Sequence, residues 1–212
     1  MKKGMVLLLL FLFSQSFSLT LEQVKTELKK ASVPWDSIEI NFRTTVRTKE
    51  VYQQTDIYIV NKGKGKSYTE IKNDFLKQRS IVNCNKMKVV DLKTNKSQIM
   101  DYHGEALKSL DFADFNPLDS GEWSEPKLVS NELYAIEGGN GILYYNGRLK
   151  RIEKLEAEKG LANTLTTFTY DADNNLKKMV VSVVVNGVES IVTTEILRMQ
   201  KSDKISDKLF DY

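Results

Sequence analysis

The sequence predicts a mainly β protein, built on one long antiparallel sheet with a single N-terminal helix. Apolar and polar residues alternate with a period of two over residues 38–42, so that Ile40 and Phe42 share one face of a strand. Asn-Gly pairs at 146–147 and 186–187 separate further segments of this kind, and Asn-Gly is a strong signal for a type I′ hairpin turn. The connections are too short for crossover helices, and the strands are therefore expected to pair antiparallel.

The first 18 residues have the pattern of a secretory signal peptide. Two lysines precede an apolar segment, residues 5–13, that is too short to span a membrane. Ser16 and Ser18 are the small residues that signal peptidase requires, and we expect cleavage before Leu19. A lipoprotein would carry Cys at that position. The sequence thus predicts a soluble, periplasmic, non-acylated protein with one domain over residues 19–212.

Composition excludes several classes of protein. The chain is 41% hydrophobic and 28% charged, which is ordinary for a globular domain. Without the two lysines of the signal, 29 basic residues face 28 acidic ones, so no basic field is available for nucleic acid. The single Cys cannot form an internal disulfide, and stability must come from packing. We expect a monomer.

The clearest helix is predicted over residues 20–31. Thr20 and Gln23 fit a capping box, in which each side chain accepts a backbone N–H of the first turn. One apolar stripe follows the capping box at helical spacing, formed by Leu21, Val24, Leu28 and Ala31.

Most of the remaining chain has strand character. The predicted strands are residues 38–42, 51–60, 68–75, 79–82, 87–92, 128–136, 142–145, 148–155, 164–170, 176–185 and 188–197. Residues 104–127 break this pattern and combine a short helical stripe with an irregular aromatic loop. Long loops inside a compact sheet are often lids or binding segments.

No constellation of catalytic residues is visible. His103 is the only His, and Cys84 lies in a predicted turn, so a Cys–His couple between them is a weak alternative. Residues 171–175 begin like a calcium loop, but Leu176 stands where that loop needs Gly. We expect no metal, no cofactor and no enzymatic activity.

Residues 179–185 are apolar on both faces of a strand, with only Ser182 interrupting. An antiparallel sheet commonly leaves one face to water, so this strand needs a cover on both sides. The sequence leaves two interpretations open, a hydrophobic cavity or a filled core.

In the order of these parts, the mature chain resembles the LolA-like family of periplasmic lipoprotein carriers. The matching parts are the helix 21–31, the strand regions 38–46, 52–60, 66–75 and 80–92, the lid-like segment 104–118 and the ending 205–210. The resemblance implies a single strongly curved, incomplete antiparallel β-barrel of about 10–11 strands. The N-terminal helix and a short lid helix would cover its open side.

The resemblance also implies a non-covalent activity. A hydrophobic cavity would bind the acyl chains of lipoproteins and carry them toward the outer membrane. The implied partners are acylated lipoproteins or other lipids, together with inner- and outer-membrane lipoprotein-transfer proteins. Arg43 and Arg79 are both possible counterparts of the family's functional Arg, and neither is assigned. The alternative is a structural or adhesive β-domain of the envelope with a filled core.

The alternating strands and the doubly apolar strand need a common interior, and they predict the binding residues. The predicted cavity wall is Ile40, Phe42, Ile57, Ile59, Val181 and Val183. The predicted lid is Leu107, Leu110 and Phe112.

Overall fold

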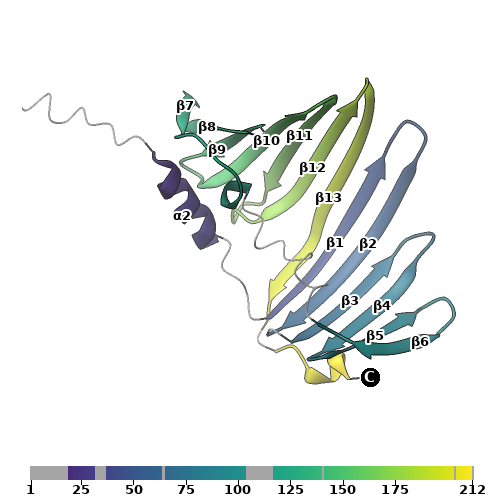
Figure 1. Ribbon diagram of the computed structural model, residues 1–212. Helices are drawn as coiled ribbons and strands as arrows, with labels where there is room; N and C mark the ends of the chain where they lie inside the picture. Colours follow the sequence, from purple (N-terminus) through teal and green to yellow (C-terminus); the bar gives the residue numbers. More distant parts are fainter. Residues whose placement is uncertain are drawn as a thin grey trace, which may run out of the picture.

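The computed structural model describes residues 19–31, 37–63, 65–103, 117–139, 141–202 and 204–211. Within these ranges the protein consists of one α-helix, two short 3-10 helices and one thirteen-stranded antiparallel sheet (Figure 1). The predicted signal peptide lies outside the described residues.

The helices and strands have the following bounds. The helices are α2 (Leu21–Ala31), η2 (Pro117–Asp119) and η3 (Asp207–Phe210). The strands are β1 (Ser37–Arg47), β2 (Tyr52–Lys62), β3 (Lys66–Lys72), β4 (Lys77–Asn83), β5 (Lys86–Asp91), β6 (Ser97–Asp101), β7 (Lys127–Ser130), β8 (Leu133–Gly138), β9 (Gly141–Asn146), β10 (Arg151–Lys159), β11 (Ala162–Tyr170), β12 (Leu176–Val185) and β13 (Val188–Lys201).

The predicted helix and its capping box are confirmed. The backbone N–H of Thr20 donates to Gln23 Oε1 at 2.9 Å, and the N–H of Gln23 donates to Thr20 Oγ1 at 3.3 Å. Val24, in the middle of the predicted stripe, is fully buried. The reciprocal bonds satisfy two N–H groups that the first helical turn would otherwise leave free.

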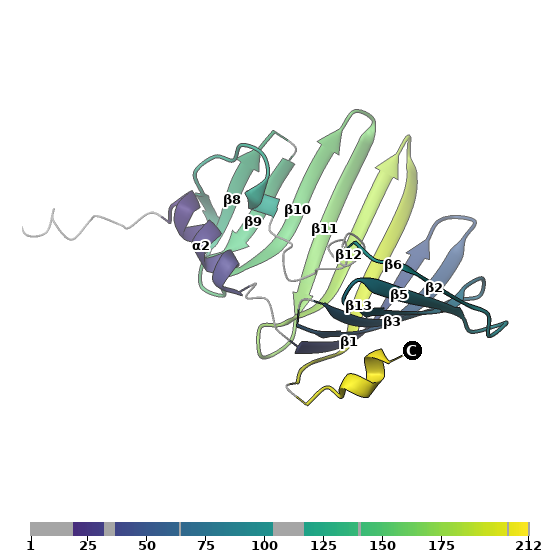
Figure 2. The same cartoon turned by 60° about the horizontal axis from the view of Figure 1, so that its bottom comes forward.

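The strand order is β6-β5-β4-β3-β2-β1-β13-β12-β11-β10-β9-β8-β7. Each half is a meander of hairpins, and the long ladder between β1 and β13 joins them, from Ile38 opposite Lys201 to Arg47 opposite Ile191. The order of the described strands ends on β6 and β7, so they form an open sheet and not a closed barrel. Figure 2 shows how the half from β1 to β6 turns away from the half that carries α2. The predicted incomplete barrel is thus confirmed.

Two strands more than predicted are present. Residues 97–101 form β6, an exposed edge strand whose polar sequence has little strand signal. The segment 128–136 was expected as one strand, and it divides into β7 and β8 at a turn where Glu132 has φ +63°. The structure also ends β3 at Lys72. Phe75, predicted in that strand, lies in the following turn and is 80% exposed.

Opposite faces of the sheet carry separate cores. Val24 of α2 packs against Ile136, Leu143 and Tyr145, and we call the side of the sheet that carries these residues the α2 face. On the other side, which we call the η3 face, Val60, Tyr68 and Ile81 pack around Phe210 of η3. The curved sheet is therefore covered on one face at its β8–β11 end and on the other face near β3 and β4.

Both hairpins predicted at Asn-Gly pairs are present, and one of them has the predicted type I′ turn. Asn186 and Gly187 have φ of +51° and +79°, as a type I′ turn requires. The turn after Asn146 is longer, and its left-handed residue is Lys150, with φ +54°. A Cβ atom on Gly147 would lie 2.9 Å from the ring of Tyr134, so close packing explains this glycine better than turn geometry does.

The prediction that β12 is buried on both sides is wrong. Its valines from Val180 to Val184 are only partly buried, and Val185 is 41% exposed. The strand is apolar on two faces, but among the described elements α2 packs mainly on β8–β11 and η3 packs on β3 and β4.

Candidate functional site

Four of the predicted wall residues form two directly paired positions. In the ladder between β1 and β2, Ile40 lies opposite Ile59, and Phe42 lies opposite Ile57. Side chains at directly opposite positions of an antiparallel pair point to the same face, with Cβ atoms about 4.5–5.5 Å apart. The four side chains therefore make one contiguous apolar patch.

The other two predicted wall residues reach the same face through β13. Val181 of β12 lies opposite Val192, and Val192 lies opposite Val46 of β1. Val46 is an even number of residues from Phe42 on an extended strand, so the side chains of both point to one face. Val183 follows Val181 by two residues and joins them.

The shared face is the α2 face. From Val181 the ladders run through Thr166 to Leu155, and Leu155 lies opposite Leu143, which contacts the α2 core. Phe42 and Ile59 are 3% and 2% exposed, whereas the other four predicted residues are partly buried. The predicted lid residues Leu107, Leu110 and Phe112 lie outside the described residues.

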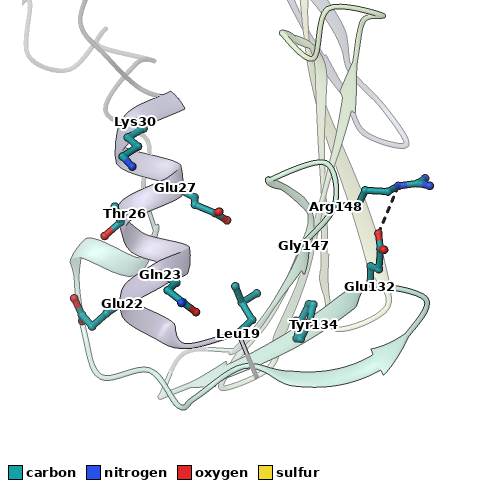
Figure 3. A pocket seen from close by; sticks show the side chains of 10 residues that line it. All are labelled: Leu19, Glu22, Gln23, Thr26, Glu27, Lys30, Glu132, Tyr134, Gly147 and Arg148. Carbon is teal, nitrogen blue, oxygen red and sulfur yellow. Dashed lines mark ion pairs between the residues drawn. The ribbon is translucent and has the colours of Figure 1, made fainter. Parts of the chain in front are cut away.

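A cavity of about 670 Å³ lies beside α2 (Figure 3). Charged and polar side chains contribute to its lining together with apolar surface, and none of the six predicted wall residues is among them. The lining consists of Leu19, Glu22, Gln23, Thr26, Glu27, Lys30, Glu132, Tyr134, Gly147 and Arg148. Across the cavity from the helix, Arg148 Nε lies 3.5 Å from Glu132 Oε2. A pocket lined by both signs of charge does not offer the dry apolar surface that an acyl chain needs.

Glu27 fastens α2 to the sheet. The Tyr145 hydroxyl donates to Glu27 Oε2 at 2.6 Å, and Lys150 Nζ lies 3.0 Å from Oε1. Burial acts to raise the pKa of Glu27, but these two partners outweigh it and hold the pKa below its ordinary value. Burial and the same carboxylate raise the pKa of Tyr145. The carboxylate of Glu27 thus holds the helix to Tyr145 of β9 and to Lys150 in the turn that follows.

Both arginines considered from the family resemblance lie on the η3 face. Arg43 Nε donates to Asp56 Oδ1 at 2.7 Å, and Arg79 Nη2 lies 2.8 Å from Glu70 Oε1. The register pairs Glu70 with Tyr58, which contacts the η3 core. Neither guanidinium therefore faces the predicted cavity wall.

Cys84 gives no support to the Cys–His alternative. It is exposed in the β4–β5 turn with φ +57°, and its Sγ lies 3.6 Å from Asn83 Oδ1. Across the described part of the chain, no three His, Cys, Asp or Glu side chains gather closely enough to hold a metal ion. Asp171 instead closes the predicted turn, since its Oδ1 accepts the N–H groups of Asp173 and Asn175 at 3.0 and 2.8 Å. Among the described elements, no helix is long and apolar enough to cross a bilayer.

Two polar residues on the α2 face were not predicted from the sequence as part of the site. Asn61 and Ser67 lie opposite one another on β2 and β3, and Asn61 follows Ile59 by two residues. Continuing the alternation Ile57, Ile59 by one step would have placed Asn61 on the predicted wall. The pairing of β2 with β3 brings Ser67 to it.

Comparison with solved structures identifies the class of fold. A LolA superfamily protein from Nitrosomonas europaea matches with a TM-score of 0.53 and 16% identity, over 92% of this chain and 98% of that chain. An outer membrane lipoprotein-sorting protein domain from Vibrio parahaemolyticus matches with a TM-score of 0.51 and 8% identity, over 89% and 95%.

The chain therefore has a LolA-like fold, as its sequence predicts. No model of a protein family matches the sequence, and no curated protein matches it.

Proposed function

We propose that this protein is an exported carrier that shields acyl chains of lipoproteins, or of other lipids, against the α2 face of its sheet. The observation that carries this proposal is that two apolar patches share the α2 face. They are joined through Val46 and Val192, beside the hydrogen-bonded pair of Thr44 and Thr194. Ile40, Phe42, Ile57 and Ile59 of β1 and β2 share a face with Val181 and Val183 of β12. This wall crosses the junction of the two halves of the sheet.

The chemistry of the wall suits an acyl chain. Each CH₂ group that leaves water contributes about 0.8 kcal/mol, so a lipid leaves a membrane only for a receptor that keeps the chain dry. Ile40, Ile57, Val181 and Val183 are partly buried and offer branched apolar surface without a charge. The lid proposed from the sequence, Leu107, Leu110 and Phe112, would close over the bound chain.

The fold supports the same function. One structural neighbour is an outer membrane lipoprotein-sorting domain, and lipoprotein sorting requires a partner that holds acyl chains outside a membrane. The signal-like first 18 residues fit a periplasmic carrier that exchanges its cargo with membrane proteins. We propose no enzymatic role.

The test uses two neighbouring valines on opposite faces of β12. Val181→Asn places an amide in the proposed wall, and Val180→Asn makes the same change on the η3 face. We expect Val181→Asn to lower the affinity for a fluorescent fatty acid by about 5–30-fold, because roughly 1–2 kcal/mol of apolar contact is lost. The control variant should keep the affinity of the unmodified protein, and thermal melting of both variants measures the effect on stability.

Equal affinities of the two variants would contradict the proposed location of the site. If the unmodified protein binds no acyl probe, the carrier function is wrong. The alternative, an envelope β-domain with a filled core and no lipid ligand, would then take its place.

A further inference from the structure

Among the residues that the structure describes, two polar side-chain atoms on the α2 face are buried without a hydrogen-bond partner. They are Oδ1 of Asn61 in β2 and Oγ of Ser67 in β3, and Ser67 is only 1% exposed. The two residues are directly opposite in the ladder, so their Cβ atoms lie about 4.5–5.5 Å apart. Buried polar groups are normally paired, and an unpaired one reduces stability.

The surroundings of this pair are apolar. On the α2 face Asn61 lies opposite Ile38 of β1, and Ser67 lies opposite Val82 of β4. Ile59, the wall residue nearest along β2, is 2% exposed, and Val82 is 4% exposed. The unpaired carbonyl and hydroxyl therefore stand at the end of the proposed acyl-binding wall.

The two lysines next to this pair in sequence belong to the other face, whereas Lys201 of β13 lies on the α2 face opposite Ile38, one strand further from Asn61. Lys62 and Lys66 alternate with Asn61 and Ser67 along β2 and β3, and their Nζ atoms lie 3.2 and 2.6 Å from Oδ1 of Asp207, the first residue of η3. The pair on the α2 face thus offers a hydroxyl and an amide without a formal charge. Such groups suit a neutral ligand group better than a phosphate or a carboxylate.

We propose that Asn61 and Ser67 bind the amide or ester group at which an acyl chain joins its head. Ser67 Oγ donates its proton to the ligand carbonyl, and Asn61 Oδ1 accepts the N–H of an amide. This inference rests on the proposed carrier function. It adds a polar subsite that determines how far the acyl chain extends along the wall. The site is closed in the structure, so binding requires the α2 face to open around the ligand.

The experiment compares two probes with the same acyl chain, N-methyldodecanamide and methyl dodecanoate. Both offer a carbonyl oxygen, but only the amide offers an N–H. One net hydrogen bond corresponds to about 3–10-fold in affinity, so the unmodified protein should prefer the amide by that factor. This comparison needs no variant and is independent of folding defects.

Three variants then assign the preference to residues. Asn61→Leu should remove the preference for the amide and keep the affinity for the ester. Ser67→Ala should lower the affinity for both probes by about 3–10-fold. The melting temperature of this variant should stay the same or rise, because a buried unpaired hydroxyl is removed. Ser80→Ala is the matched control, since Ser80 lies on the same face and its Oγ already accepts from Gln78 Nε2 at 3.2 Å.

The outcomes separate this inference from the carrier function. If both probes bind equally well, and Asn61→Leu and Ser67→Ala behave like Ser80→Ala, the polar subsite is wrong and the carrier function stands. If neither probe binds to the unmodified protein, the carrier function fails and this inference fails with it.

Discussion

At the scale of single residues, the Glu70 carboxylate on the η3 face has a strongly lowered pKa. Burial acts to raise its pKa, and hydrogen bonds from Lys72, Tyr68 and Arg79 outweigh burial and lower the pKa to about 2. Burial and the same carboxylate raise the pKa of Tyr68 to about 12. The cluster ties β3 to β4 on the face away from the proposed site.

The lowered pKa predicts a specific dependence of stability on pH. A carboxyl group whose pKa falls on folding stabilises the native state above its unfolded pKa, and this contribution is lost as the pH falls through the folded pKa. We therefore expect the free energy of unfolding to decrease by up to about 3 kcal/mol between pH 4.5 and pH 2 through Glu70.

Urea unfolding of Glu70→Gln across this pH range measures the contribution. The variant should be less stable than the unmodified protein at neutral pH and should lose less stability on acidification. Glu50→Gln, at an exposed position of the β1–β2 turn, is the control. Parallel pH curves for the unmodified protein and Glu70→Gln would disprove the assignment to Glu70.

The sequence predicts correctly which face of the sheet a side chain points to where apolar and polar residues alternate along one strand. Ile40 and Phe42, or Ile57 and Ile59, follow from alternation alone. Asn61 and Ser67 could not be predicted as a pair, because only the ladder between β2 and β3 places them opposite each other.

At the scale of elements, α2 shows the difference between local and tertiary determinants. Its boundaries follow from Thr20, Gln23 and the apolar stripe, all of which are local in sequence. Its attachment depends on the bond between Glu27 and Tyr145, residues 118 positions apart, and no local pattern predicts that bond.

This attachment can be weakened without changing the apolar packing. Tyr145→Phe removes the hydroxyl and leaves the ring, and we expect about 1.5–3 kcal/mol less stability, the range for hydrogen bonds to charged groups. Hydrogen exchange of the α2 amides should accelerate more than exchange in β12. Tyr144→Phe is the matched control, because its hydroxyl bonds Glu156 on the opposite face of β9 at 3.0 Å.

Unchanged protection of α2 in Tyr145→Phe would show that Val24 and its apolar neighbours suffice to hold the helix.

At the scale of the whole molecule, the ladder between β1 and β13 determines the fold. It pairs residues that are about 150 positions apart, so its formation closes a very long loop. The hairpins of both halves could be predicted from their turns. The joining of the halves, and with it the union of Phe42 and Val181 on one face, needed the family resemblance or the structure.

The central claim is that an acyl chain lies on the α2 face, between the β1–β2 wall and β12. It is tested most directly by nuclear Overhauser effects between the methylene protons of bound dodecanoate and the Ile and Val methyl groups of the full chain. Contacts should appear at Ile40, Ile57, Val181 and Val183 and be absent at Val180, on the opposite face of β12. Contacts confined to Val180 or to the η3 core, or no contacts at all with saturating ligand, would contradict it.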